Sequence, residues 1–485
     1  MALVAGIDSS TQSCKVVILD SDTGATIRTG RAPHPDGTEV SPTFWWTALL
    51  EAMHDAGGLA DVSSLAIAGQ QHGMVLLDAE GRVIRDALLW NDTRSAVSAE
   101  ALIAEFGAAT LVERAGSVPV ASLTITKVRW VRDNEAANAA HVAAVALPHD
   151  WLSWRLRGYG PADESPLGPD LEQLATDRSD ASGTGYWSPA RGAYDLELFE
   201  AAFGRPGREA GSPSQAGTHV VLPKVVAPSD VMGTVHADHS GGNEIVIGAG
   251  AGDNAAGALG LGITAGDVVI SLGTSGTVFA AATAAVNDPS GTVAGFADAA
   301  GAYLPIAVTL NAARILSSVA DLLDVSFDDF AELALAANPG SDGVVLVPYF
   351  EGERTPNLPN AKASFHGLSI ASTTRANTAR AAIEGMLCGL ADGLDAVTAS
   401  GVNAQRLLLI GGAAQNPAVQ AVAAQVFSVP VIVPAPGEYV ARGAAVQAEW
   451  ALNGVRPDWE LELDAAPSAD HHPIIREQYG SYSGS

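Results

Sequence analysis

Residues 268–280 read Val-Val-Ile-Ser-Leu-Gly-Thr-Ser-Gly-Thr-Val-Phe-Ala, and this stretch decides the fold. Its apolar, β-branched ends predict two strands, and the Gly, Ser and Thr residues between them predict a tight turn. Residues 3–19 repeat the plan: an apolar run, a polar turn rich in Ser and Thr, and a second apolar run. Two such hairpins, half a chain apart, predict two domains of similar plan.

A hairpin of this composition has a chemical use. Hydroxyl groups and successive backbone N–H groups in a turn can surround a phosphate, so two facing hairpins can hold a nucleotide between two domains. The same pattern also fits two ordinary hairpins. Spacing and composition alone leave both interpretations open.

The segments around the first hairpin predict the fold class. We expect strands at residues 3–7, 16–19 and about 25–31, then a helix from Pro42 to about residue 56, then a strand at 64–68. This order of strands and helix predicts a mixed sheet in the α/β class. The chain has 485 residues, which is too long for one hydrophobic core and predicts two or three domains. We expect the main boundary between about residues 235 and 250.

Two other segments look irregular in the sequence. Residues 158–185 are rich in Gly, Pro, Asp and Glu and contain no Lys, which predicts a long surface loop. The residues after about 456 predict a weakly ordered tail.

The overall charge restricts the partners. The chain carries 54 acidic and 26 basic residues, a net charge of −28, which argues against nucleic acid or an anionic membrane as a partner. Only two cysteines are present, which predicts a reducing compartment. The N-terminal residues do not resemble a signal peptide, and no apolar run is long enough to span a bilayer. We therefore expect a cytoplasmic protein.

Asp253 lies at a position suited to chemistry. A strand at 244–247 leads into the glycine-rich turn 248–252, and the Ala-rich run after Asp253 predicts a helix. A carboxylate at such a junction can cap the helix or face a ligand that approaches the backbone. Both interpretations remain open on this pattern alone.

The same junction has a third interpretation. Gly250, Gly252 and Ala255 fit a loose dinucleotide-binding fingerprint, which needs an acidic residue about 20 positions on, at the end of the next strand. That strand ends in Leu272-Gly273 without an acid, so a dinucleotide site is disfavoured. No Gly-Lys pair occurs in the chain, which excludes a P-loop.

Two further polar segments follow strands or turns. Gln71 and His72 come after the strand at 64–68, and both side chains donate and accept hydrogen bonds, as hydroxyl recognition requires. A loop histidine satisfied by its neighbours is an equally good interpretation. Residues 90–94, Trp-Asn-Asp-Thr-Arg, combine an aromatic wall with polar groups, a mixture found in sugar sites and also in ordinary turns.

Several longer motifs match a known family. The first is Ser122-x-Thr124-x-x-Lys127-Val128-x-Trp130-Val131-x-Asp133-Asn134; the second runs from Ala363-x-Phe365-x-Gly367-Leu368 through Asn377 to Glu384, with Thr378 where an apolar residue is usual. With residues 252–257, 271–276 and 411–413, they make the chain from about residue 3 to 452 resemble the FGGY carbohydrate kinases. The resemblance implies an α/β, two-domain actin-like ATPase (ribonuclease H-like) fold with ATP and sugar in the interdomain cleft. The expected domains are 1–246 and 247–452, followed by the tail 453–485.

The resemblance also implies roles for individual residues. Asp253 is the expected general base, and Asp8 is expected beside Mg²⁺ and the phosphates, so that these two carboxylates are the expected metal site. The residues expected to bind ATP are Thr11, Gln12, Ser13, Lys15, Gly273, Thr274, Ser275, Gly412, Ala413 and Asn416. The residues expected to bind the sugar are Gln71, His72, Trp90, Asp92 and Asn254.

The expected sugar is D-xylulose. Residues 70–73 and 90–92 are similar to those of family members that act on xylulose, whereas members that act on glycerol have Arg-Glu at positions 71 and 72. The chain departs from the usual pattern at Gln71, where Met is common, and at Ser9-Ser10. Kinases of ribulose, gluconate or glycerol remain alternatives, as does an actin-like ATPase switch without a metabolite substrate. The oligomeric state stays open, with a homodimer among the options.

Overall fold

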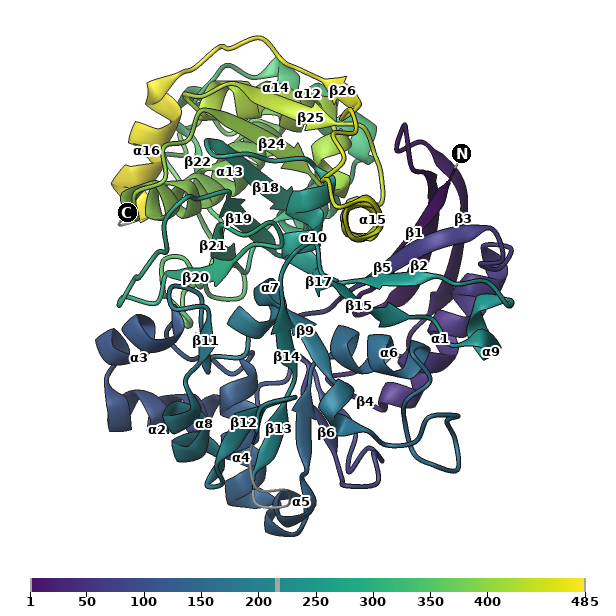
Figure 1. Ribbon diagram of the computed structural model, residues 1–485. Helices are drawn as coiled ribbons and strands as arrows, with labels where there is room; N and C mark the ends of the chain where they lie inside the picture. Colours follow the sequence, from purple (N-terminus) through teal and green to yellow (C-terminus); the bar gives the residue numbers. More distant parts are fainter. Residues whose placement is uncertain (1, 214–218, 484–485) are drawn as a thin grey trace. The chain divides into compact units, whose positions relative to one another are not determined.

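The computed structural model describes residues 2–213 and 219–483 (Figure 1). The chain forms two compact units. The first consists of Met1–Gly262, Gly295–Tyr303 and Glu438–Glu460, and the second of Ile263–Ala294, Leu304–Gly437 and Leu461–Ser485. Residues 484–485 of the expected tail lie outside the described residues. In the part of the chain that is described, no helix has the length and apolar character needed to cross a bilayer.

The main sheet of the first unit has the strand order β15-β16-β5-β1-β2-β3, with β17 beside β5. Strands β1 and β2 form an antiparallel hairpin that β3 extends, while β5 runs parallel to β1 on its other side. The bounds are β15 (Val231–Thr234), β16 (Val246–Gly248), β5 (Val62–Gly69), β1 (Leu3–Ser9), β2 (Ser13–Asp20), β3 (Thr26–Pro33) and β17 (Ala251–Gly252).

The described part of the first unit also contains ten smaller strands, the helices α1 to α10, and helix α15 from near the end of the chain. The strands are β4 (Glu39–Val40), β6 (Val75–Leu77), β7 (Ala87–Leu88), β8 (Ala144–Ala146), β9 (Ala175–Asp177), β10 (Trp187–Ser188), β11 (Ala193–Tyr194), β12 (Gly207–Glu209), β13 (Val220–Leu222) and β14 (Lys224–Val226). The helices are α1 (Pro42–Asp55), α2 (Ala96–Phe106), α3 (Ala108–Ala115), α4 (Thr124–Asn134), α5 (Ala136–His141), α6 (Pro148–Leu156), α7 (Arg178–Ser182), α8 (Leu196–Phe203), α9 (Ala237–Ser240), α10 (Asp253–Gly260) and α15 (Tyr439–Asn453), with a 3₁₀ turn at Leu171–Gln173.

The other large sheet has the order β20-β21-β19-β18-β24-β25-β26, and its strands belong to the second unit except for Gly295–Ala297 of β20 and Tyr303 of β21. Its strands are β20 (Val293–Ala297), β21 (Tyr303–Thr309), β19 (Gly276–Ala280), β18 (Asp267–Leu272), β24 (Arg406–Ile410), β25 (Val431–Pro434) and β26 (Leu463–Ala465). The other elements are β22 (Val345–Val347), β23 (Ser364–His366), α11 (Ala313–Leu323), α12 (Phe327–Ala336), α13 (Arg375–Ala399), α14 (Pro417–Val426), α16 (Pro473–Ser483) and 3₁₀ turns at Ser341–Gly343 and Gly412–Gln415.

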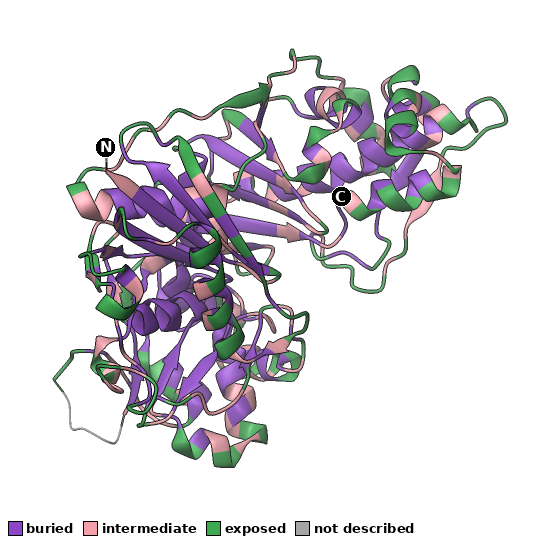
Figure 2. Ribbon diagram, turned by 90° about the vertical axis from the view of Figure 1, so that its right-hand side faces the viewer, coloured by how far each residue is buried: buried purple, intermediate pink, exposed green. Residues whose placement is uncertain are grey.

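The two sheets share one plan, which confirms the prediction from the paired hairpins. In the second unit, β18 and β19 form an antiparallel hairpin extended by β21, and β24 runs parallel to β18 on the other side. The first unit has the same arrangement in β1, β2, β3 and β5. The central strands are buried along nearly their whole length (Figure 2), which explains why their sequences are continuous apolar runs rather than alternating ones.

Helix α15 packs against both β1 and α10 (Figure 1). At Gly6 of β1, an added Cβ would lie 1.8 Å from the carbonyl oxygen of Ala441. At Gly443 of α15, it would lie 1.8 Å from the carbonyl oxygen of Ala256 in α10. Both separations are far inside van der Waals contact, so only glycine permits these helix and strand backbones to pack so closely.

The loop expected at 158–185 is wrong over its last third. Residues 175–182 form β9 and α7, and Asp177 and Asp180 are buried there. The prediction relied on polar composition, but these carboxylates are turned inward beside His149 of α6.

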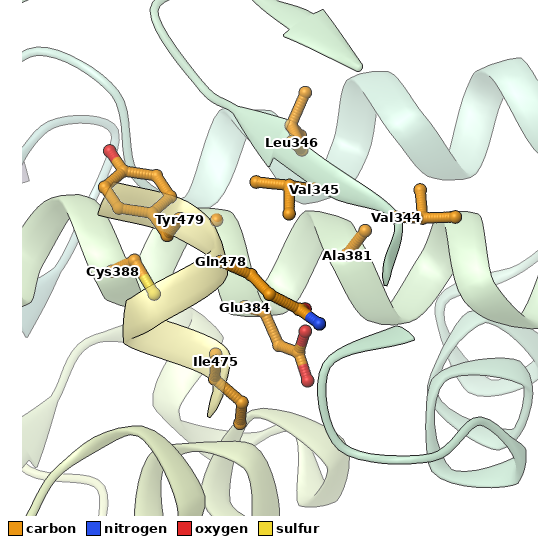
Figure 3. Close-up of a pocket in the computed structure, with 10 residues that line it drawn as sticks. Val344, Val345, Leu346, Ala381, Glu384, Cys388, Ile475, Gln478 and Tyr479 are labelled. Atoms are coloured by element: carbon orange, nitrogen blue, oxygen red, sulfur yellow. The ribbon is translucent and has the colours of Figure 1, made fainter. Parts of the chain in front are cut away.

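The weakly ordered tail is also wrong for residues 463–465, which form β26, and for residues 473–483, which form α16 and pack within the second unit. Figure 3 shows Ile475 and Tyr479 of α16 beside Cys388 of α13 and Val345 of β22. The cavity between them has a volume of about 10 Å³, room for about one water. Apolar side chains at helical spacing therefore hold this segment in place.

The division of the chain differs from the expected boundary at 246/247. The first unit continues to Gly262, because β16, β17 and α10 pack on its sheet. Residues 438–460 return to it from the far end of the chain because α15 lies on β1 and β5.

The contact of α15 with α10 gives the first prediction. We expect Gly443→Ala to destabilise the protein by about 1–3 kcal/mol, because the new methyl group overlaps the α10 backbone. The matched control is Gly257→Ala in α10, where an added Cβ meets only Val440 at 3.8 Å and where Ala favours the helix by about 0.5–1 kcal/mol. Thermal unfolding measures both. A Gly443→Ala protein as stable as Gly257→Ala would contradict the close contact.

Candidate active site

The carboxylate of Asp8 lies at the end of β1, opposite Lys15 of β2. It is buried, with 2% of its surface exposed. The Ser10 hydroxyl donates to Asp8 Oδ1, and Lys15 Nζ lies 3.8 Å from Asp8 Oδ2. Burial raises the pKa of Asp8 to about 6, against the opposing effects of Ser10 and Lys15. A buried carboxylate with so elevated a pKa favours a nearby positive charge.

The turn between β1 and β2 contains the first group of expected phosphate-binding residues. Gln12 is exposed, Thr11 is half-buried, and Ser13 begins β2 in a buried position. The indole N–H of Trp90 donates to Thr11 Oγ1 over 2.9 Å, which fixes one side of the turn. Gln12 is thus the exposed residue of this turn, between the half-buried Thr11 and the buried Ser13.

Asp253 is the first residue of α10, and the helix-cap interpretation is wrong. The N-cap is Gly252, and no side chain caps the helix. Asp253 Oδ1 accepts hydrogen bonds from the backbone N–H of Asn254, at 2.7 Å, and from its side-chain amide, at 3.0 Å. A capping carboxylate would instead accept from the N–H groups two or three residues on. Capping is therefore not what this carboxylate does.

The pKa of Asp253 is raised to about 7, first by burial and then by the negative charge of Asp8, against the hydrogen bonds from Asn254. Asp8 and Asp253 are far apart in sequence but belong to the same unit. Elevated pKa values in neighbouring carboxyl groups are typical of catalytic sites and of sites that bind a cation.

Gln71 and Asn254, both expected to bind sugar, are brought together. The Asn254 side-chain amide donates to Gln71 Oε1 over 3.3 Å. Gln71 is buried against Gly252, where an added Cβ would lie 2.5 Å from Gln71 Nε2. Gly252 therefore leaves the space that Gln71 fills beside the Asp253 junction.

His72 has an uncommon backbone conformation, with φ of 68°. Such conformations cost energy for residues other than glycine and persist where surrounding contacts impose them. Here the buried Lys127 donates to the carbonyl oxygen of His72 over 2.7 Å. The ring Nδ1 lies 2.7 Å from the carbonyl oxygen of Gly183 and therefore donates to it, since a carbonyl oxygen can only accept.

Lys127, to which the sequence assigned no role, contacts the backbone of the candidate site. It is completely buried, and burial lowers the pKa of its amine to about 7, opposed by the charge of Asp92. Its amine also donates to the carbonyl oxygen of Ser122 over 2.7 Å. Its place in the first family motif was the available signal, but the contact with His72 spans 55 positions and is visible only in the fold.

Trp90 and Asp92 differ in accessibility. Trp90 is 44% exposed, whereas Asp92 is 4% exposed. Asp92 accepts hydrogen bonds from Arg94 and from the hydroxyl of Thr38. Burial raises its pKa, but these bonds outweigh burial and the pKa lies below its ordinary value. Asp92 therefore orders this turn and the exposed Trp90 beside it.

Glu438 is a second residue that the sequence did not single out. Its carboxylate accepts from Lys15 Nζ over 2.6 Å, although the two residues are 423 positions apart. Glu438 precedes α15, so the packing of α15 on β1 places it beside the hairpin. Lys15 is thereby held at the mouth of the turn, between Asp8 and Glu438.

The second unit carries the other expected ATP-binding residues at one edge of its sheet. Gly273, Thr274 and Ser275 form the accessible turn after β18, and Gly412 and Ala413 follow the adjacent strand β24. Gly411, with φ of 98°, approaches the carbonyl oxygen of Leu272 so closely that an added Cβ would lie 2.5 Å away.

Asn416, also expected beside ATP, has a structural task. Its side chain caps α14 by accepting from the backbone N–H of Ala418 over 2.9 Å. It therefore fixes the start of the helix that follows the Gly411–Ala413 turn.

The elevated pKa of Asp253 predicts a stability effect. In the unfolded chain this carboxyl has a pKa of 3.8, and in the folded chain about 7. The folded state binds its proton more tightly, so its contribution to the free energy of unfolding falls as pH rises from about 4 to about 7. We expect Asp253→Asn to raise Tm by a few degrees at about pH 8 without added cations, and by less as pH falls towards 4.

Asp195→Asn is the matched control with the opposite sign. Burial raises the pKa of Asp195, but hydrogen bonds from Arg114 and Arg191 outweigh burial and hold it well below its ordinary value. This substitution should lower Tm at about pH 8. A fall in Tm for both variants would contradict the conclusion that burial and the charge of Asp8 disfavour the ionised form of Asp253.

Comparisons with known proteins agree on the family. The model of the FGGY family of carbohydrate kinases, N-terminal domain, matches residues 3–260, and that of the C-terminal domain matches 268–452. The chain is 43% identical over 461 residues to a xylulose kinase of Streptomyces coelicolor, covering 93% of this chain and 88% of that protein. It is 46% identical to a xylulose kinase of Bifidobacterium adolescentis of known structure, with a TM-score of 0.91 and 99% of each chain covered.

A more distant structure shares the fold alone. Glycerol kinase of Plasmodium falciparum has 19% identity and a TM-score of 0.83. The prediction of a two-domain α/β fold of the ribonuclease H-like class is confirmed. The chain belongs to the FGGY family of carbohydrate kinases and is a sugar kinase with ATP as its co-substrate.

Proposed function

We propose that this chain transfers the γ-phosphoryl group of ATP to D-xylulose, yielding ADP and D-xylulose 5-phosphate. The sugar is inferred from the relatives, which are named xylulose kinases at up to 43% identity over most of the chain. The single observation that carries the mechanism is the carboxyl of Asp253, whose pKa is raised to about 7 at the start of α10.

Asp253 is the proposed general base. The bond from the sugar oxygen to the γ-phosphorus forms as the bond from that phosphorus to the β–γ bridging oxygen breaks, and the hydroxyl proton passes to Asp253. A base is most effective when its pKa lies near the working pH, and such catalysis typically contributes about 10²–10⁴-fold. The hydrogen bonds from Asn254 fix the direction of the carboxylate.

Asp8 and Asp253 are the proposed holders of Mg²⁺. Carboxylate oxygens are ligands that Mg²⁺ prefers, and two neighbouring carboxyl groups with elevated pKa values fit a divalent cation. When bound, Mg²⁺ would neutralise charge on the transferring phosphoryl group. Lys15, held between Asp8 and Glu438, is proposed to add positive charge there.

The remaining expected residues divide between ATP and the sugar. Thr11, Gln12 and Ser13 are proposed to bind phosphates through the turn after β1, as are Gly273, Thr274 and Ser275 through the turn after β18. Gly412, Ala413 and Asn416 are proposed to lie beside the adenosine.

For the sugar, we propose that Gln71, His72 and Asn254 bind hydroxyl groups. Trp90 supplies an exposed apolar wall, while Asp92 acts by ordering the turn. We also propose that the enzyme acts in the cytoplasm, with a homodimer as one option for its oligomeric state.

A coupled assay of ADP release tests the function. With saturating MgATP, we expect D-xylulose to stimulate ADP release far above the rate without sugar, and above the rates with ribulose, gluconate and glycerol. Asp253→Asn should lower kcat by about 10²–10⁴-fold. The matched control Asp195→Asn, in a carboxylate paired with Arg114 and Arg191, should keep most of kcat at temperatures where it is folded.

Three outcomes would contradict parts of the proposal. If another sugar stimulated ADP release as much as D-xylulose or more, D-xylulose would not be the preferred substrate. ADP release that no sugar changes would favour an ATPase switch instead. Retention of most of kcat by Asp253→Asn would exclude it as the base.

A further inference from the structure

A cluster of four ionisable side chains is buried in the first unit, close enough to Asp253 for their charges to interact. His149 and Asp150 begin α6, Asp177 ends β9, and Asp180 lies in α7. Their side chains are at most 2% exposed. Three carboxyl groups thus surround one imidazole away from water, where burial opposes the ionisation of Asp150 and Asp180 by raising the pKa of each.

The imidazole lies at the centre of the cluster. Its Nε2 is 3.3 Å from one oxygen each of Asp150, Asp177 and Asp180. A single N–H can point at only one of three oxygens. Among the described residues, Nε2 of His149, Oδ1 of Asp150 and both oxygens of Asp180 have no hydrogen-bond partner. Buried polar atoms without partners are rare and suggest a ligand or ion.

The distances fit a specific kind of ligand. Zn²⁺ binds imidazole nitrogen and carboxylate oxygen at about 2.0–2.2 Å in a tetrahedron, so its ligand atoms lie about 3.3–3.5 Å apart. The three separations of 3.3 Å from Nε2 fall in this range. Ligand atoms of His149, Asp150 and Asp180 all lie within 4.8 Å of one another. Ca²⁺ would need six to eight oxygen ligands, more than this cluster provides.

We propose that His149, Asp150 and Asp180, with Asp177 packed beside them, form a buried structural site for a divalent transition-metal ion, zinc in the first place. The hydrogen bonds that the other carboxylate oxygens make support this arrangement. Asp150 Oδ2 accepts from the backbone N–H of Leu147 over 2.8 Å, and Asp177 Oδ2 accepts from that of Ser179 over 2.7 Å. Such outer contacts orient carboxylates that ligate a metal.

The position of the cluster indicates what the ion would do. An added Cβ at Gly69 would lie 3.1 Å from His149 Cβ, and one at Gly250 would lie 3.0 Å from His149 Nδ1. The backbone N–H of Gly252 donates to Ser179 Oγ over 3.1 Å. Gly69 ends β5 before Gln71, and Gly252 precedes Asp253. The ion would therefore stabilise the ends of the two strands that lead to Gln71 and to Asp253, whatever sugar the protein uses.

Metal analysis of the full-length protein tests the proposal. Wild-type protein is unfolded in denaturant that contains a chelator and is then refolded with or without ZnCl₂. Both samples are dialysed into metal-free buffer without nucleotide or Mg²⁺. Elemental mass spectrometry should find about one Zn²⁺ per chain after refolding with zinc. The Tm of this sample should be higher than that of the sample refolded without zinc. Less than about 0.1 ion per chain, with equal Tm values, would overturn the proposal.

Asp180→Asn separates the metal site from a cluster that only shares protons. With a metal, the variant loses a ligand, so it should retain little zinc and melt below zinc-loaded wild type. Without a metal, it replaces a carboxyl group whose pKa burial raises well above its ordinary value with a neutral amide of the same shape, so it should melt no lower than wild type refolded with zinc, which would contradict the proposal.

Asp253→Asn is the matched control, because it also removes a carboxyl group but leaves His149, Asp150 and Asp180 intact. It should retain about one zinc ion per chain. Loss of the ion in Asp253→Asn and its retention in Asp180→Asn would place the metal at the proposed catalytic carboxylates and overturn the buried site.

Discussion

The close backbone contact of α15 with β1 on one side and α10 on the other is the constraint on which the site depends. Gly6 and Gly443 permit it, since an added Cβ at either position would lie 1.8 Å from a carbonyl oxygen. Asp8 lies near the end of β1, and Asp253 begins α10. One helix from the far end of the chain therefore sets how two carboxylates lie within the same unit.

That arrangement has an energetic cost with a chemical use. Burial and the charge of Asp8 raise the pKa of Asp253 to about 7, so the ionised carboxylate destabilises the folded protein at neutral pH. A carboxylate of this kind accepts a proton more readily than an exposed one and attracts a divalent cation. Function and stability thus make opposite demands on this residue, as is common at active sites.

Local pattern predicted the paired hairpins, because strands and turns depend on neighbouring residues, and the family motifs predicted the enzyme class. Contacts between distant segments were not predictable in this way. Glu438 meets Lys15 across 423 positions, and the acidic residues near 177–180 looked like a loop because composition does not reveal that they turn inward. Asp253 was compatible with a helix cap because the pattern places the residue at the junction but does not show which N–H groups its oxygens accept from.

The pH dependence of sugar phosphorylation tests the role of Asp253 most directly. With both substrates well below their KM values, the rate constant reports the pKa values of the free enzyme. The account predicts that kcat/KM for D-xylulose falls about tenfold per pH unit below about pH 7, and more steeply below about 6 as Asp8 is also protonated. A kcat/KM that stays constant from about pH 8 to about 5.5 would contradict a base with this pKa.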